Sequence, residues 1–188
     1  MIPDREEAHR LLREAETYNP GPWGDHSRVA ADCACKIAMA AGMDGEKAYV
    51  LGLLHDIGRK FGIYHMPHIY RGYHYMMELG YEEVARVCLT HSFSTPDLRT
   101  YIGKFDVTDE QLEEMKELLA EMVYDDYDRL IQLCDALAMA EGVVDIETRM
   151  LDVKRRYGHY PQEKWDNNLA LKAYFEEKCG KSIYEVVK

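Results

Sequence analysis

Three histidines of this chain occupy the same kind of position, at one end of an apolar stripe with helical spacing. His26 precedes apolar residues at offsets of three, four, seven and eleven, whereas His55 and His91 follow apolar or small residues at offsets of three, four and seven. Positions with these offsets lie on one face of an α-helix, so all three imidazoles are predicted to face the interior. One such histidine is most simply a core residue with a backbone hydrogen bond, but three together favour a shared site.

Asp135 is an acid in an almost wholly apolar segment, Leu133–Ala140. An unpaired buried carboxylate is very costly, so it should become neutral, pair with a cation or bind a metal ion. Basic residues are few nearby, and Arg129 lies six positions before Asp135, which disfavours a simple ion pair. The alternative is that Asp135 faces outward on a helix that is only locally apolar.

Asp56 directly follows His55. Consecutive helical residues point about 100° apart, so this pair can bind one metal ion only where the side chains bend around it or where the helix ends. Gly58 supplies such an end. The second oxygen of a carboxylate would allow Asp56 to bridge two ions. Imidazole and carboxylate ligands without thiolate favour iron, manganese, zinc or nickel.

His26, the His55–Asp56 pair and Asp135 together resemble the H…HD…D signature of the HD-domain metal-dependent phosphohydrolase superfamily. The segment Gly52–Arg59 is also similar to the end of that family's central helix. The resemblance covers most of the chain and implies a bundle of helices around a buried metal centre. It also implies hydrolysis of a phosphate ester or anhydride, often of a nucleotide, by attack of a metal-bound hydroxide.

Some branches of this superfamily hold two metal ions with the help of two further histidines. The segment His68–Gly72 resembles the H-x-x-x-G that follows HD in bacterial dinucleoside-tetraphosphate hydrolases, and His91 resembles that branch's next histidine. His74, on a more mixed helix face, is the substitute for His68. The resemblance implies a first ion held by His26, His55, Asp56 and Asp135, and a second held by Asp56, His68 and His91.

Arg59 follows the His55–Asp56 pair closely and is predicted to be catalytic together with Asp56, binding a substrate phosphate through paired hydrogen bonds. An equally good alternative is a surface arginine favoured by the negative end of a helix. The residues Ile57-Gly58-Arg59 and the long irregular segment 92–123 depart from the dinucleoside-tetraphosphate hydrolase pattern. The substrate can therefore differ even where the metal centre is shared.

Three functions stay open. The first is a phosphohydrolase with two ions of Fe, Mn, Ni, Co or Zn. The second holds a single ion, and its His68 and His91 contact the substrate or act as general acid. The third is a metal-stabilised nucleotide-binding or regulatory HD module without turnover. The complete ligand set argues against this third function, because a binding protein has no evident need for every ligand.

Helical patterns that recur along the chain must position these side chains. They predict an all-α bundle of the HD-domain type with about eight to ten helices, in a single domain over residues 1–188. The HD core is expected at about 20–142 and a C-terminal helical extension at about 143–188. One helix is expected to run from Asp125 to Glu141. Whether the extension covers the site or forms a homodimer face stays open.

The composition excludes several partners. The chain has 23 basic and 34 acidic residues among 188, a net charge of −11, which disfavours nucleic acid and anionic membranes as partners. Its N-terminus lacks the pattern of a signal peptide, and Val50–Leu54 is too short an apolar run to cross a membrane. Five cysteines without a Cys-x-x-Cys spacing predict reduced thiols. We therefore expect a cytoplasmic protein that acts on a phosphorylated small molecule, with a nucleotide as the expected substrate.

Overall fold

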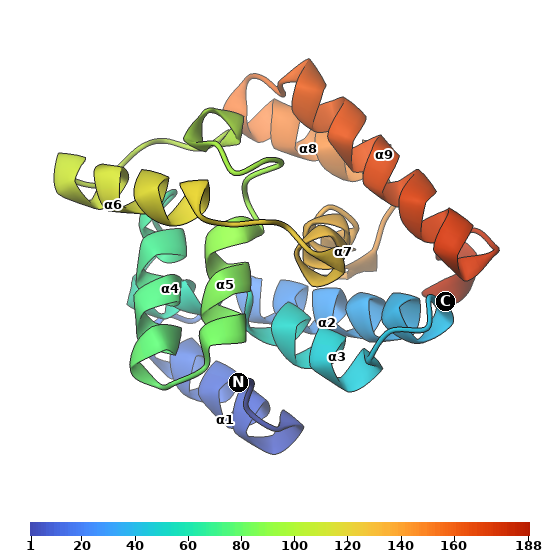
Figure 1. Ribbon diagram of the computed structural model, residues 1–188, viewed down its shortest axis with the longest axis horizontal. Coiled ribbons are helices and arrows are strands. Elements are labelled where there is room, and N and C mark those ends of the chain that lie inside the picture. The colour runs from blue at the N-terminus through green and yellow to red at the C-terminus, as the bar shows by residue number, and fades with distance from the viewer.

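The computed structural model describes residues 1–188 and consists almost entirely of helices (Figure 1). The ten α-helices, two short 3-10 helices and two short strands are α1 (Arg5–Tyr18), α2 (Trp23–Ala40), α3 (Gly45–Leu54), η1 (Ile57–Phe61), α4 (Pro67–Glu78), α5 (Glu82–Thr90), η2 (Leu98–Thr100), α6 (Asp109–Ala120), α7 (Asp126–Asp135), β1 (Ala138–Met139), β2 (Gly142–Val143), α8 (Ile146–Tyr157), α9 (Gln162–Cys179) and α10 (Ile183–Val186). The predicted all-α class is therefore confirmed.

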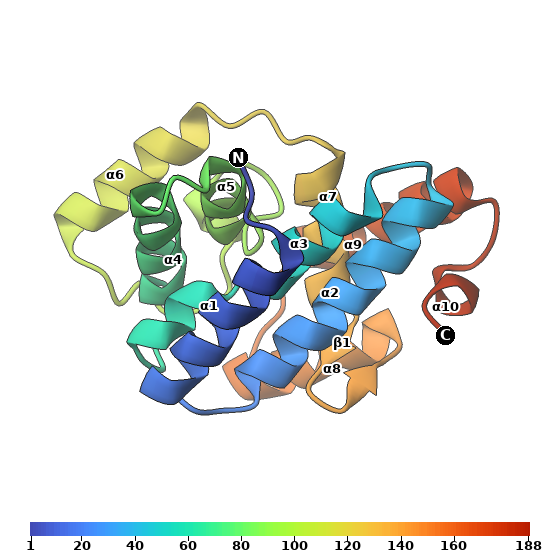
Figure 2. The same cartoon turned by 90° about the horizontal axis from the view of Figure 1, so that it is seen from below.

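The largest core forms where α2, α3 and α7 pack together (Figure 2). The buried face of α2 is rich in alanine, and the facing residue on α3 is Gly52. A Cβ atom built on Gly52 would lie only 2.9 Å from the Cα of Ala31. Small residues on both helices therefore allow the two backbones to approach closely. This packing brings the N-terminal end of α2 and the C-terminal end of α3 together.

The irregular segment 92–123 contributes to a second, smaller hydrophobic core. Its members are buried side chains of α4, α5 and α6 and of the residues that flank these helices: Met66, Ile69, Leu89, Phe93, Met115 and Leu119. The segment therefore carries α6 across to cover α4 and α5. It encloses a separate apolar cluster rather than extending the main core.

The helix expected from Asp125 to Glu141 is shorter than predicted. Helix α7 ends at Asp135, and β1 and β2 form an antiparallel hairpin in which Ala138 pairs with Val143. Gly142 has φ of 138°, a conformation open to glycine, and it closes the turn of the hairpin. Apolar helix-forming residues favour a longer helix, but the local turn and tertiary contacts override that propensity.

The C-terminal helices pack back onto the bundle. Helix α9 contacts α7 and α2, with Phe175 fully buried, and α10 contacts α2 and α9. In Figure 1, α8 and α9 lie on the side of α7 opposite to α2 and α3. None of the helices combines the length and apolar character required to span a membrane.

Candidate metal centre

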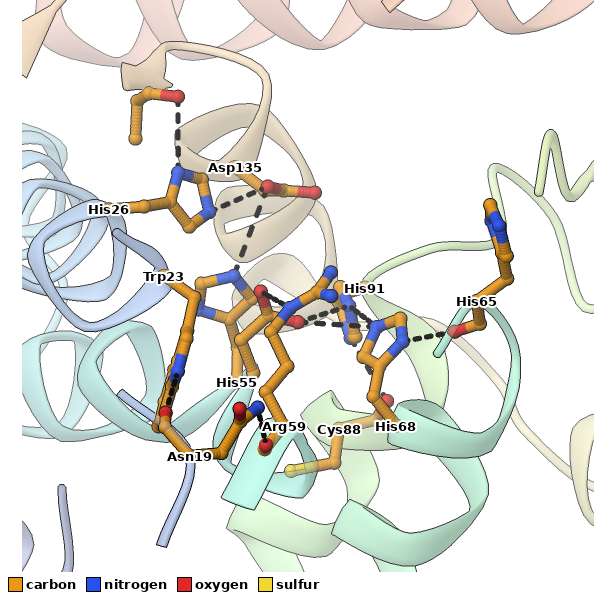
Figure 3. A network of polar contacts seen from close by, with 12 residues as sticks. Asn19, Trp23, His26, His55, Arg59, His65, His68, Cys88, His91 and Asp135 are labelled. Carbon is orange, nitrogen blue, oxygen red and sulfur yellow. Dashed lines mark hydrogen bonds and ion pairs between the residues drawn. The ribbon is translucent and has the colours of Figure 1, made fainter. Parts of the chain in front are cut away.

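Six predicted ligand residues come together at the ends of helices (Figure 3). They lie in the first turn of α2 (His26), at the C-cap of α3 (His55), at the N-cap of η1 (Asp56), in the first turn of α4 (His68), at the C-cap of α5 (His91) and at the last position of α7 (Asp135). Helix ends leave room for side chains to turn toward one point.

His26, His55 and Asp135 form the first group, in which the ligand atoms lie within 4.8 Å of one another. The Oδ1 atom of Asp135 is 3.0 Å from Nε2 of His26 and 3.9 Å from Nε2 of His55. Three chain segments thus present two imidazoles and one carboxylate to the same space.

Asp56, His68 and His91 form the second group, and their donor atoms make a nearly equilateral triangle. Oδ1 of Asp56 is 3.2 Å from Nε2 of His68 and 3.5 Å from Nε2 of His91, and the two Nε2 atoms are 3.4 Å apart. Donors held about 2.1 Å from one metal ion at tetrahedral or octahedral angles lie about 3.0–3.4 Å apart. The triangle therefore has the size that a transition-metal ion requires.

Backbone carbonyls fix the orientation of all four imidazoles. The Nδ1 atoms of His26, His55 and His91 lie 3.1, 2.7 and 2.9 Å from the carbonyl oxygens of Ala138, Gly52 and Cys88, and Nδ1 of His68 contacts the carbonyl oxygen of His65. Because a carbonyl only accepts, each Nδ1 carries a proton, and in the neutral imidazole Nε2 then carries the lone pair. The backbone bond expected of a core histidine is thus also what prepares these histidines as ligands.

Two buried atoms of the cluster have no hydrogen-bond partner, Nε2 of His55 and Oδ1 of Asp56. Oδ1 of Asp56 instead faces the lone pairs of His68 and His91, an arrangement that is repulsive without a cation. Burial of polar atoms in this state costs free energy unless something binds them. The donor set and its unpaired atoms therefore fit a metal ion.

Residues 23–140 match the model of a protein family described as the HD domain. The chain belongs to the HD domain family. A comparison with curated proteins and one with solved structures gave no match. All six candidate ligand residues of this HD domain lie within the matched segment, whereas α8, α9 and α10 lie outside it.

Burial keeps two imidazoles of the HD domain neutral at pH 7. Burial lowers the pKa of both His55 and His68 to about 4. Burial alone would raise the pKa of Asp56, but the neighbouring Arg59 guanidinium holds it well below its usual value. Burial likewise opposes ionisation of Asp135, and the contact with His26 lowers its pKa nevertheless. At neutral pH the site thus presents lone pairs and negative charge together, as a metal centre requires.

Arg59 lies within the site rather than on the surface. Its Nε atom donates to Oδ2 of Asp56 at 2.5 Å, and its side chain is 29% exposed. Oδ2 of Asp56 thus accepts from Arg59, whereas Oδ1 is the oxygen that faces His68 and His91. The bridging role of Asp56 between two ions stays a prediction.

His74 and His68 point to different surroundings on α4. Nε2 of His74 lies 3.1 Å from Glu114 on α6, and the His74 side chain is 37% exposed. His74 belongs to neither ligand group, whereas His68 belongs to the second.

A cavity of about 610 Å³ opens over both ligand groups. Asp135 lines it and keeps 31% of its side chain exposed, so this aspartate faces the cavity rather than the apolar interior that its sequence neighbours suggested. Asp56, His68 and His91 lie at the same cavity and are almost fully buried. A ligand in the cavity therefore has access to both groups.

A buried ion pair that the sequence pattern did not reveal fixes α5 on α7. Asp128 is fully buried, accepts from Arg86 at 2.5 Å and accepts from the hydroxyl of Thr90 at 2.8 Å. Gln132, one turn further along α7, donates to the carbonyl of Thr90 at 3.1 Å. Because His91 directly follows Thr90, these contacts set its position. Arg86 and Asp128 lie 42 residues apart in an otherwise ordinary charge pattern, so no local signal marks them.

Proposed function

We propose that this HD domain is a metal-dependent phosphohydrolase that cleaves a phosphate ester or anhydride of a small molecule, and that the substrate is a nucleotide. The proposal rests on the buried and unpaired Nε2 of His55 and Oδ1 of Asp56, which lie in two adjacent ligand groups inside one cavity. HD domains are in general metal-dependent phosphohydrolases. Two ligand groups favour two ions, as in the branch that the sequence resembles.

The residues of the chain have separate tasks in this proposal. The imidazoles and carboxylates of the two groups hold the ions, with their Nε2 atoms aimed by the backbone. Bound ions of this type supply an activated water molecule and positive charge for the phosphate oxygens. The terminal amino groups of Arg59 have no hydrogen-bond partner within the chain, so they are free to donate to a substrate phosphate while Nε remains on Asp56.

The cavity supports a substrate of nucleotide size. Its volume of about 610 Å³ is within the range of small-molecule sites. Aromatic side chains from separate segments line it, namely Trp23, Tyr64, Tyr101 and Tyr157. Such rings offer flat apolar surfaces that a base can contact while the phosphate lies at the ligand groups.

A screen of metals against substrates tests this proposal. Protein loaded with Fe, Mn, Ni, Co or Zn is assayed with nucleotides, dinucleoside polyphosphates and phosphate monoesters, and bound metal is measured for each form. We expect about two ions per chain, one for each ligand group, and turnover of at least one nucleotide. Nucleotide that stays bound but chemically unchanged over hours in every metal form would instead favour a binding or regulatory module.

Replacing His68 and His74 by alanine separates the two candidates for the second ligand group. We expect His68→Ala to lose about one ion per chain and to lower kcat by more than about 100-fold, since a ligand contributes more than the outer contacts whose loss costs 10–100-fold. His74→Ala keeps both ions because its imidazole contacts Glu114 and not the cluster. Metal analysis of the two purified variants decides between them, and equal metal loss would contradict this assignment of the ligand.

A further inference from the structure

The C-terminal extension forms one wall of the cavity that contains the ligand groups. Arg149, Arg156 and Tyr157 of α8 and Lys164 of α9 line this cavity. These residues lie outside the segment that matches the HD domain. The family match therefore accounts for the metal ligands but not for this wall.

Outside the ligand groups, the cavity lining carries more positive than negative charge, although the chain as a whole has a net charge of −11. Apart from the five candidate ligand residues that line it, the cavity lining includes four cations, Arg59, Arg149, Arg156 and Lys164, and two carboxylates, Glu141 and Asp152. Asp152 is itself shared among three arginines of α8. Positive charge gathered in one cavity of an acidic protein indicates an anionic ligand.

Among these four cations, Lys164 has the least favourable surroundings within the protein itself. Its Nζ atom donates to the carbonyl oxygen of Ser92 at 2.6 Å, and no carboxylate of the chain pairs with it. A lysine in the first turn of a helix also faces the positive end of the helix dipole, which disfavours it. Burial lowers the pKa of Lys164 to about 8, so placing this ammonium group here costs free energy.

The contact with Ser92 places Lys164 beside the second ligand group. Ser92 directly follows His91, and Lys164 and His91 line the same cavity. An ammonium group has three donors, and Ser92 uses one of them. Arg149 likewise keeps its Nε atom buried without a hydrogen-bond partner. Two cations of the extension thus have donors that no residue of the chain satisfies.

We infer that Lys164, together with Arg149 and Arg156, forms an anion subsite for a second phosphate group of the substrate. The subsite belongs to the proposed phosphohydrolase and defines its substrate class: a molecule with a diphosphate or longer phosphate chain rather than a simple monoester. One phosphate lies at the metal ligands, and the next is bound by the extension. The extension is therefore a specificity element of the site.

ADP and AMP test the subsite, because they differ by one phosphate group. Their affinities for the metal-loaded protein are measured by calorimetry, and kcat/KM is measured for each where turnover occurs. We expect the wild type to prefer ADP, and Lys164→Met to reduce the ratio of ADP to AMP affinity about tenfold or more, the typical effect of a charge-assisted hydrogen bond. Lys154→Met is the control, since Lys154 is an exposed residue of α8 that does not line the cavity.

Metal content is measured for each variant, so that a lost subsite is distinguished from a lost ion. An unchanged ADP to AMP ratio in Lys164→Met, with full metal content, overturns the subsite. If the wild type binds ADP in preference to AMP but hydrolyses neither these nor any compound of the screen, the phosphohydrolase proposal fails while the subsite stands. If it hydrolyses nucleotides without preferring the second phosphate, the subsite fails and the phosphohydrolase stands.

Two adjacent arginines provide a second test that does not depend on Lys164. Arg155 and Arg156 both bind Asp152, at 2.7 and 2.9 Å, but only Arg156 lines the cavity. We expect Arg156→Gln to lower the ADP to AMP affinity ratio and Arg155→Gln to leave it as in the wild type. Equal effects of the two substitutions would show that the charge of α8 acts only through the general field of the protein.

Discussion

Asp56→Ala is expected to lose metal and activity together. Oδ1 of Asp56 is the only carboxylate oxygen in the second ligand group, and no other acid is placed to replace it. We expect loss of at least one ion per chain and a fall in kcat/KM of more than about 100-fold, since even residues outside the ligand shell contribute 10–100-fold. Metal analysis and steady-state kinetics on the best substrate of the screen provide the measurement.

Thermal unfolding gives a second readout of the same variant that is independent of turnover. A ligand at about 100 times its Kd stabilises a folded protein by about 2.7 kcal/mol, so added metal should raise the Tm of the wild type. Asp56→Asn, which keeps the shape of the side chain but not its charge, should lose most of this increase. Asp32→Ala removes an exposed carboxylate of α2 and should respond to metal as the wild type does. Wild-type metal content and turnover in Asp56→Ala would show that the site is wrongly assigned.

Gly58→Ala is expected to cause the largest loss of stability. A Cβ atom at this position would lie 1.9 Å from the carbonyl oxygen of His68 and 2.6 Å from the amide nitrogen of Gly72. Both are backbone atoms of α4, so the helix itself would have to move, and His68 with it. Overpacking typically costs about 1–3 kcal/mol, and we expect the upper end of this range or more. The expected fall in Tm is about 6–12 °C for a chain of this size.

Gly80→Ala provides the control for this prediction. Gly80 follows the end of α4 with φ of 77°, and no atom lies within 4 Å of the place that a Cβ atom would occupy there. Its substitution costs about 1–2 kcal/mol of backbone strain without displacing His68. Calorimetric unfolding and metal analysis compare the two variants. We expect weaker metal binding at the second group only for Gly58→Ala, and equal Tm values for the two would contradict the close packing of η1 on α4.

The residues of the candidate centre could be predicted from the sequence because each one belongs to a local sequence pattern. An imidazole at the end of an apolar stripe lies on the inward face of its helix, and the structure places His26, His55 and His91 in this way. The H-x-x-x-G spacing of His68 and Gly72 also has a structural reason, since Gly72 packs against the amide of Gly58. Only the tertiary structure separates the six candidate ligands into two groups and places Arg59 on Oδ2 of Asp56.

Local propensity predicts the wrong element where tertiary contacts compete with it. The apolar residues after Asp135 favour a longer helix, yet they form a hairpin whose Ala138 carbonyl accepts from His26. The end of α7 at Asp135 turns this side chain toward the cavity. A pattern of apolar residues indicates which face of a helix is buried. It does not indicate where tertiary contacts end that helix.

The helical class and the ligand residue types can be read from the amino-acid sequence, because hydrogen bonding and apolar periodicity within a helix act over a few neighbouring residues. Which residues share the cavity depends instead on how the helices pack. Lys164 and Ser92 are 72 positions apart, and Arg86 and Asp128 are 42 apart. No periodic pattern connects such pairs, since their contact arises only when separate helices meet. Local segments thus reveal the candidate metal ligands, whereas the cationic wall formed by Arg149, Arg156 and Lys164 arises only in the folded molecule.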